Sequence, residues 1–166
     1  MINKRYLLDT NSLSSLTKSH DSHHEKLLSK VSAMDDNVEL YASIISLYEM
    51  EYGACHAKEP ELIAATREAI QYIKDTDENE TENGIKLYGL TKNGAKIFGE
   101  IKEQFQKHKE EIGEKIGKRS LPKHNVDLII AATAIELKAT LISNDETIFK
   151  LIDKILSDFT WEDWTK

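Results

Sequence analysis

The sequence predicts an α/β domain built on a mainly parallel β-sheet. Short apolar runs typical of strands alternate with longer segments of helical spacing, and strands that alternate with helices usually form parallel sheets. The chain has 166 residues, a length that suits one domain over 1–166. Hydrophobic residues make up 40% of it, which is enough for a single core.

The first quarter of the chain predicts one strand and two helices. Residues 4–8 form a strand that ends in three apolar residues. Residues 9–12 are polar types that favour turns and helix caps, so a short helix follows over 13–18. A helix over 23–34 places three apolar side chains on one stripe.

The next segment predicts a strand and two more helices. Residues 38–42 form the strand, and Ser43 can cap a helix that runs to about residue 56. Pro60 suits the first turn of a helix, which is predicted over 59–74. The acidic stretch 75–84 has no large apolar residue and is predicted to be a loop.

The second half predicts an extended helical segment at about 74–123, followed by a compact end. Within that segment, 85–90 can form a strand, 91–116 has the apolar spacing of one long helix, and 117–123 is a basic loop. Asn125 can cap a helix that is apolar nearly all round and should be buried. The remaining elements are that helix over 126–137, a strand over 139–143, a helix over 144–152 and a last strand over 154–157.

Composition excludes several classes of protein. A single cysteine, Cys55, rules out an internal disulfide framework and a cysteine-based zinc cluster. No apolar run reaches the roughly 7–15 residues of a signal peptide or the roughly 18 of a membrane span, so a cytoplasmic protein without a membrane partner is expected. The net charge of −7 disfavours non-specific coating of nucleic acid, but it is compatible with a nuclease whose acids bind a metal ion.

Two acids lie where a parallel sheet places its ligand sites, beyond the carboxyl ends of strands, and a third lies at the start of the buried helix. Asp9 and Asp145 follow strand-like runs, and Asp127 lies in the first turn of the buried helix. Each also has a structural interpretation. Asp9 can cap a helix, Asp127 can complement a helix dipole, and Ser143 with Glu146 can form a capping box around Asp145.

A fourth acid lies in the helix that follows Ser43, and spacing leaves two candidates. Glu49 shares a face with Ile45 and Gly53, whereas Glu51 lies on the opposite side of the helix. Both faces are partly apolar. Four converging carboxylates repel one another, and a divalent cation relieves that repulsion. Carboxylate oxygens suit Mg²⁺ or Mn²⁺.

Four segments resemble, in order, the motifs of PIN-domain ribonucleases. They are 6–11 (YLLDTN), 43–53 with an acid four residues before a glycine, 127–134, and 140–149. The tail 158–164 is similar to the family's short closing strand and tryptophan. The resemblance implies a PIN-like three-layer α/β/α fold and a VapC-like toxin of a type II toxin–antitoxin system.

The resemblance also implies a chemistry. It assigns the acidic position of the second motif to Glu49, and it implies an Mg²⁺- or Mn²⁺-dependent endoribonuclease whose products carry a 5′-phosphate and a 3′-hydroxyl. Asn11 and Ser143 would orient the carboxylates through hydrogen bonds. The residues expected to bind the metal and carry the cleavage are Asp9, Glu49, Asp127 and Asp145.

The implied partners are RNA, a small antitoxin from the neighbouring gene and a second copy in a homodimer. The antitoxin would insert a basic side chain among the acids. Basic residues outnumber acids by three between 101 and 124, which predicts an RNA-facing strip, although a solvated amphipathic helix and loop fit equally well. The candidate RNA-binding residues in the strip are Lys115, Lys118, Arg119 and Lys123.

Other functions stay open on the residues alone. A housekeeping RNA-processing nuclease would need the same acids. A non-catalytic module would use them as caps and bind a partner through the long middle helix. A phosphoryl-transfer protein fits less well, because Asn11 stands where a phosphatase needs a second aspartate and 143–145 offers no receiver-type lysine.

Overall fold

The computed structural model describes residues 4–81, 84–113 and 124–166. Strands and helices alternate along most of the chain. The strands are β1 (Lys4–Leu8), β2 (Val38–Ser43), β3 (Ile85–Tyr88), β4 (Thr140–Ile142) and β5 (Trp161–Glu162). The helices are α1 (Thr10–Thr17), α2 (His24–Ser32), α3 (Ile44–His56), α4 (Pro60–Glu78), α5 (Lys92–Glu111), α6 (Asn125–Leu137) and α7 (Glu146–Ile155).

The five strands form one sheet in the order β3-β2-β1-β4-β5, and every pairing is parallel. β1 lies in the centre, where Leu8 is in register with Ala42 of β2 and Ile142 of β4. The carboxyl ends of these three strands therefore meet at one edge. The predicted α/β class with a parallel sheet is confirmed.

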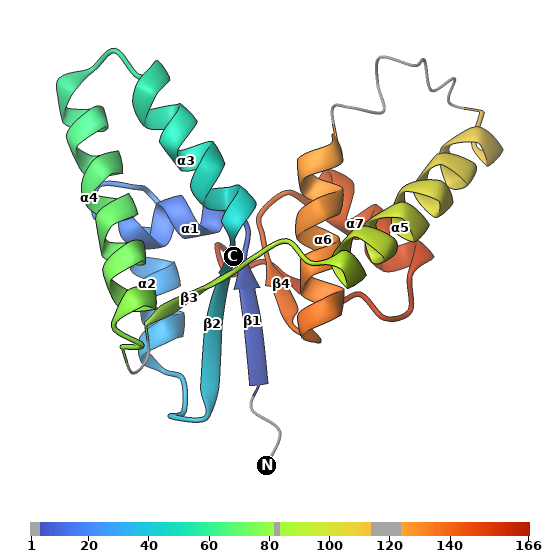
Figure 1. Ribbon diagram of the computed structural model, residues 1–166, viewed down its shortest axis with the longest axis horizontal. Helices are drawn as coiled ribbons and strands as arrows, with labels where there is room; N and C mark the ends of the chain where they lie inside the picture. Colours follow the sequence, from blue (N-terminus) through green and yellow to red (C-terminus); the bar gives the residue numbers. More distant parts are fainter. Residues whose placement is uncertain (1–3, 82–83, 114–123) are drawn as a thin grey trace.

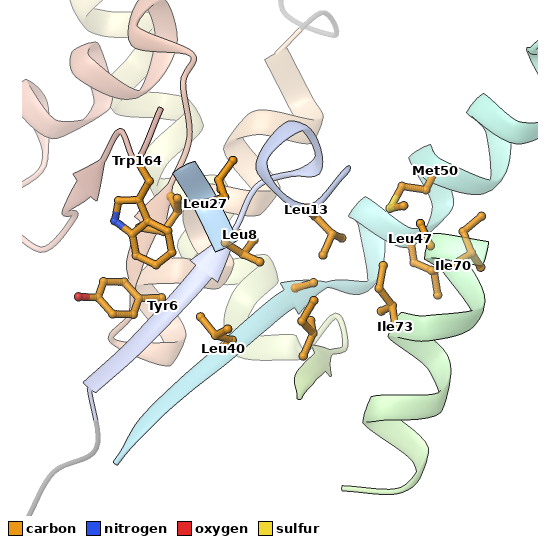
Figure 2. Packing of buried hydrophobic residues seen from close by; sticks show 14 of the residues in the cluster. Tyr6, Leu8, Leu13, Leu27, Leu40, Leu47, Met50, Ile70, Ile73 and Trp164 are labelled. Carbon is orange, nitrogen blue, oxygen red and sulfur yellow. The ribbon is translucent and has the colours of Figure 1, made fainter. Parts of the chain in front are cut away.

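Helices cover both faces of the sheet, which gives the three layers expected (Figure 1). Successive side chains of a strand point to opposite faces. Tyr6 and Leu8 of β1 accordingly pack with α1 to α4, as Figure 2 shows, whereas Leu7 packs with α5, α6 and α7. Trp164 packs in the core that contains Tyr6. Its ring lies edge-on to the ring of Tyr6, with 4.9 Å between the ring centroids. The central strand is thus buried on both faces.

The predicted loop at 75–84 is wrong over its first part, because α4 continues to Glu78. Polar side chains in this last turn bind the neighbouring strand. The Thr76 hydroxyl lies 3.3 Å from the carbonyl oxygen of Ile85, and Asp77 accepts a hydrogen bond from the Leu87 amide at 2.7 Å. The helix needs no large apolar residue here, since these bonds attach it to β3.

The last strand was predicted at 154–157, which is also wrong. Residues 154 and 155 belong to α7, which continues three residues beyond the predicted end and buries Ile148, Phe149 and Ile152 on one face. The closing strand is β5, inside the tail that the family resemblance marked. α5 ends at Glu111, and the rest of the predicted helix at 114–116 lies outside the described residues.

Two helix starts differ from the sequence prediction. α1 begins at Thr10, three residues earlier than predicted, because Asp9 caps it. Asn125 is not the cap of α6 but its first residue, and His124 occupies the cap position without a side-chain hydrogen bond. The Asn125 side chain instead accepts a hydrogen bond from Lys102 of α5 at 3.0 Å. Within the three described ranges, none of the helices is both long and apolar enough to span a membrane.

Candidate functional site

The four acids singled out from the sequence line one pocket of about 150 Å³. Two of them follow strands, since Asp9 comes directly after β1 and Asp145 lies just beyond β4. The other two, Glu49 and Asp127, come from helices that begin at this edge of the sheet. Thr10, Asn11, Ile130 and Phe149 complete the lining.

Asp9 is the most buried of the four acids, with 5% of its surface exposed. Its Oδ1 accepts a hydrogen bond from the Ser12 amide at 2.7 Å, which caps α1. Its Oδ2 accepts a hydrogen bond from the Ser143 hydroxyl, across the strand pair β1–β4. The capping interpretation is therefore correct, and it does not exclude the site, because the capped carboxylate still lines the pocket.

Burial raises the pKa of Asp9 above the usual range of an aspartate. The hydrogen bonds from Ser143 and Ser12 oppose that rise, and the negative charge of Asp127 adds to it. Ionisation of the Asp9 carboxyl group therefore costs free energy, and a nearby positive charge would lower that cost.

Asp127 is half-buried in the first turn of α6, and burial also raises its pKa. His124, whose Nδ1 lies 3.5 Å from Oδ2 of Asp127, lowers that pKa, whereas the charges of Asp145 and Glu49 raise it. All four acids are thus connected by electrostatic repulsion, because Asp127 acts on Asp9 and is acted on by the other two.

The choice between Glu49 and Glu51 is settled by what each side chain touches. Glu49 lines the pocket, where its carboxylate accepts a hydrogen bond from the Thr10 hydroxyl. Glu51 points to α4 and pairs with Lys74 at 3.0 Å and with Arg67. Residues two positions apart on a helix point to nearly opposite faces, so only one of these two acids can reach the pocket.

Ser143 joins two of the acids rather than capping α7. Its hydroxyl oxygen accepts a hydrogen bond from the Asp145 amide at 3.0 Å and donates to Asp9. The predicted capping box of Ser143 and Glu146 is wrong, because Asp145 itself caps the helix by accepting from the Thr147 amide at 3.0 Å.

Two contacts of the acids were not found by sequence reasoning. Thr10 binds Glu49, and His124 faces Asp127. Both residues could have been noticed in the sequence as polar neighbours of the motif acids, because Thr10 directly follows Asp9 and His124 lies three residues before Asp127. Asn11, expected to orient a carboxylate, lines the pocket, but no bond from its side chain to an acid is present in residues 4–81, 84–113 and 124–166.

The donor set suits a hard divalent cation, because it consists of carboxylate oxygens that repel one another. Within the described ranges, no group of three or more His, Cys, Asp or Glu side chains is already arranged to hold a metal ion. Asp9, Glu49 and Asp145 each accept a hydrogen bond from a protein donor, namely the Ser12 amide, the Thr10 hydroxyl and the Thr147 amide. The residue types fit the metal.

The predicted RNA-facing strip is only partly described. Its four named candidates, Lys115, Lys118, Arg119 and Lys123, lie outside the described residues. Of the basic residues before them, Lys102 binds Asn125 and Lys107 pairs with Glu103 at 3.2 Å within α5. These two lysines are engaged in contacts within the protein.

Comparison with known proteins places the fold. A sequence profile of the PIN domain matches residues 6–155. The chain is similar in structure to VapBC-1 from nontypeable Haemophilus influenzae, with 23% identity, a TM-score of 0.64 and coverage of 98% of this chain and 99% of that one.

Two further structures show the same fold. VapBC2 from Rickettsia felis, bound to a DNA fragment from its promoter, has 21% identity, a TM-score of 0.64 and coverage of 96% and 98%. FitAcB from Neisseria gonorrhoeae has 18% identity, a TM-score of 0.64 and coverage of 96% and 97%. No curated protein matches the sequence.

PIN domains are generally nucleases and typically use divalent metal ions. The order of strands and helices, the parallel sheet and the acids at its carboxyl edge agree with the profile match, which spans most of the chain. This protein belongs to the PIN domain family.

Proposed function

We propose that the protein is a metal-dependent endoribonuclease and the toxin of a type II toxin–antitoxin pair. The observation that carries the nuclease proposal is the pocket itself. Four carboxylates from separate parts of the chain line one small cavity, and two of them have raised pKa values that reflect burial and mutual repulsion. A catalytic cation would compensate that charge.

In this proposal the carboxylates of Asp9, Glu49, Asp127 and Asp145 hold Mg²⁺ or Mn²⁺. A divalent cation would lower the pKa of the water that attacks the phosphodiester. Its positive charge would stabilise the negative charge that develops on oxygen in the transition state. The hydroxyls of Ser143 and Thr10 orient two of the carboxylates.

The apolar side chains of Ile130 and Phe149 line the same pocket beside the acids. Cleavage would leave a 5′-phosphate and a 3′-hydroxyl.

The test is cleavage of end-labelled RNA by the purified protein with Mg²⁺ or Mn²⁺. We expect cleavage that stops on addition of a chelator and returns with excess metal. Asp9→Asn should fold and fail to cleave, because it keeps the cap of α1 but loses the charge. Asp36→Asn, in the exposed turn before β2, is the matched control and should cleave normally.

Cleavage that persists in the chelator, or in folded Asp9→Asn at the wild-type rate, would refute the metal mechanism. Complete absence of cleavage with every metal would favour a non-catalytic interaction module instead.

The toxin role is supported by similarity over nearly the whole chain to VapBC and FitAB complexes. A partner antitoxin that inserts a basic side chain among the acids would neutralise their negative charge in place of the cation. Induction of the gene should arrest growth, and co-expression of the neighbouring gene should restore it. Normal growth on induction of an active nuclease would favour a housekeeping role in RNA processing.

A further inference from the structure

Asp127 differs from the other three pocket acids in the group that contacts its carboxylate. Asp9, Glu49 and Asp145 each accept a hydrogen bond from a hydroxyl or a backbone amide. Among the residues that the structure describes, the only polar group within hydrogen-bonding or ion-pair distance of the Asp127 carboxylate is the ring of His124. In this part of the chain, the orientation of Asp127 therefore depends on one histidine.

His124 lies at the start of α6, three residues before Asp127. Residues three apart on a helix surface are neighbours, so the ring and the carboxylate lie on the same side of the helix. His124 occupies the cap position of α6, but its side chain makes no capping hydrogen bond. Its Nδ1 instead lies 3.5 Å from Oδ2 of Asp127, so the ring faces the acid.

The ring of His124 is held by the protein core. It packs edge-on against Phe105 of α5, with 5.8 Å between ring centroids and 61° between planes. Phe105 is itself 4% exposed and belongs to the core that α5, α6 and α7 form on their face of the sheet. A ring that is fixed by a buried neighbour can hold an acid in one direction, because its own rotamer is restricted by packing.

α5 makes a second contact with the same turn of α6. Nζ of Lys102 donates a hydrogen bond to the side chain of Asn125 at 3.0 Å. Lys102 lies three residues before Phe105, so both contacts come from one side of α5. The two helices lie side by side in Figure 1. The long middle helix thus attaches to two adjacent residues at the start of α6, next to the turn that carries Asp127.

His124 contacts an acid of the pocket without lining the pocket itself. Among the described residues, the lining includes Asp127 but not His124. A side chain that reacts with substrate has to reach the cavity, whereas a side chain that orients a metal ligand contacts that ligand from outside the cavity. The position of His124 therefore favours a role that acts through Asp127.

We propose that His124 is a positioning residue, whose Nδ1 donates a hydrogen bond to Asp127 and sets the orientation in which this carboxylate meets the metal ion. The inference rests on the proposed function and adds to it a residue outside the four acids. Nδ1 carries a hydrogen in one neutral tautomer and in the charged ring, so the role does not depend on titration of His124.

Two substitutions separate the hydrogen bond of His124 from its packing. His124→Phe keeps a ring against Phe105 but has no donor, whereas His124→Asn loses the ring and keeps an amide donor near the place of Nδ1. The Kd for Mn²⁺, measured by calorimetry without RNA, should rise on the order of tenfold in His124→Phe and stay within about threefold of the wild type in His124→Asn. His20→Phe, in the exposed turn between α1 and α2, is the matched control and should bind Mn²⁺ as the wild type does.

The rate of RNA cleavage gives a second readout. In His124→Phe, the Mn²⁺ concentration for half-maximal cleavage should rise by the same factor as the Kd, while KM for RNA stays unchanged. Loss of cleavage with an unchanged Kd for Mn²⁺ would mean that His124 acts on the substrate, which overturns the inference. Equal effects of His124→Phe and His124→Asn would also overturn it, because packing rather than the donor would then matter.

Nuclear magnetic resonance of the histidine rings tests the contact in wild-type protein without metal. At mildly alkaline pH, the spectrum that correlates ring nitrogens with ring protons should show a hydrogen on Nδ1 of His124. Because 3.5 Å is long for a hydrogen bond, this is the most direct test of the contact. A ring whose Nδ1 lacks the hydrogen cannot donate to Asp127 and would overturn the inference, even where a variant fails to fold.

Failure of the proposed function looks different. It appears as wild-type protein that neither binds Mn²⁺ nor cleaves RNA. Wild-type protein that binds Mn²⁺ and cleaves RNA, with an unchanged Kd for Mn²⁺ in His124→Phe, overturns the role of His124 alone.

Discussion

Acids at two places in the fold have opposite electrostatic surroundings. Near the amino ends of the strands, Glu39 of β2 is bound by Lys86 of β3 at 2.7 Å and by Arg5 of β1 at 3.0 Å, and these cations lower its pKa. At the carboxyl edge, Asp9 and Asp127 lie among other acids, and their pKa values are raised. Strands of one sheet thus carry neutralised acids at one position and uncompensated acids at another.

The difference separates a structural from a functional use of the same residue types. Two acids that pair with lysine and arginine, Glu39 and Glu51, connect one element to another. Among the residues that the structure describes, the pocket acids have only hydroxyl, amide and one histidine neighbour within hydrogen-bonding or ion-pair distance. An acid left without a cation in a pocket is a candidate for binding one from solution.

The sharpest way to break this comparison uses two acids of one helix. Glu49→Gln should lower the rate of RNA cleavage by more than about 100-fold, exceeding the usual effect of an outer partner. Glu51→Gln should retain the cleavage rate and lose only its pairing with α4. The measurement is single-turnover cleavage with Mg²⁺, after confirmation of folding by circular dichroism. Equal loss in both variants would remove the distinction between paired and unpaired acids.

Metal binding should stabilise only the protein with an intact pocket. At a Mg²⁺ or Mn²⁺ concentration about 100 times the Kd, a single site adds about 2.7 kcal/mol to the free energy of unfolding. The melting temperature of the wild type should rise with metal, and that of Asp127→Asn should rise much less. Asp36→Asn serves as the control and should respond as the wild type does. An identical response of Asp127→Asn would place the metal elsewhere.

Ser143 tests whether the acids need to be oriented as well as present. Ser143→Ala removes the hydroxyl that joins Asp9 to the Asp145 amide, and it should reduce cleavage about 10- to 100-fold. Ser15→Ala, which removes another buried serine hydroxyl from α1, should leave the cleavage rate unchanged. Full activity of Ser143→Ala would mean that the carboxylates are held by other contacts.

The smallest expected effect concerns the free energy of unfolding in the presence of chelator, which two substitutions should change in opposite directions. Because the pKa of Asp9 is raised, this residue keeps its proton to a higher pH in the folded state than in the unfolded state. The free energy of unfolding therefore falls as pH rises from the unfolded pKa to the folded pKa of Asp9. Asp9→Asn should therefore be more stable than the wild type at pH 7. That gain should vanish below the unfolded pKa of about 3.9.

Glu39 has a lowered pKa, so its contribution is present above the unfolded pKa of about 4.3 and is lost as pH falls through the folded pKa. Glu39→Gln should cost about 0.2–1 kcal/mol at pH 7, the range for partly exposed ion pairs. Urea unfolding at pH 7 and at pH 3 measures both changes. A destabilised Asp9→Asn at pH 7 would contradict the penalty assigned to its charge.

Local patterns in the chain were sufficient for most of the fold. Apolar runs such as Tyr6–Leu8 and the nearly all-apolar α6 identify strands and helices, because burial follows from short-range spacing. The positions of Asp9 and Asp145 after strands predicted acids at one edge, since parallel strands share their carboxyl ends. One error occurred where polar residues decide the structure, in the last turn of α4, whose Thr76 and Asp77 bind β3. Another concerned the last strand, because the short apolar spacing at 154–157 does not distinguish the end of α7 from a strand.

The amino-acid order by itself therefore determined which elements form, and it placed acids at their ends. Tertiary structure alone decided that Glu49 faces Thr10 while Glu51 faces α4, and that Ser143 joins Asp9 to Asp145. The physical reason is distance along the chain. Ser143 and Asp9 are 134 residues apart, so no local spacing records their hydrogen bond, which exists only once β1 and β4 pair.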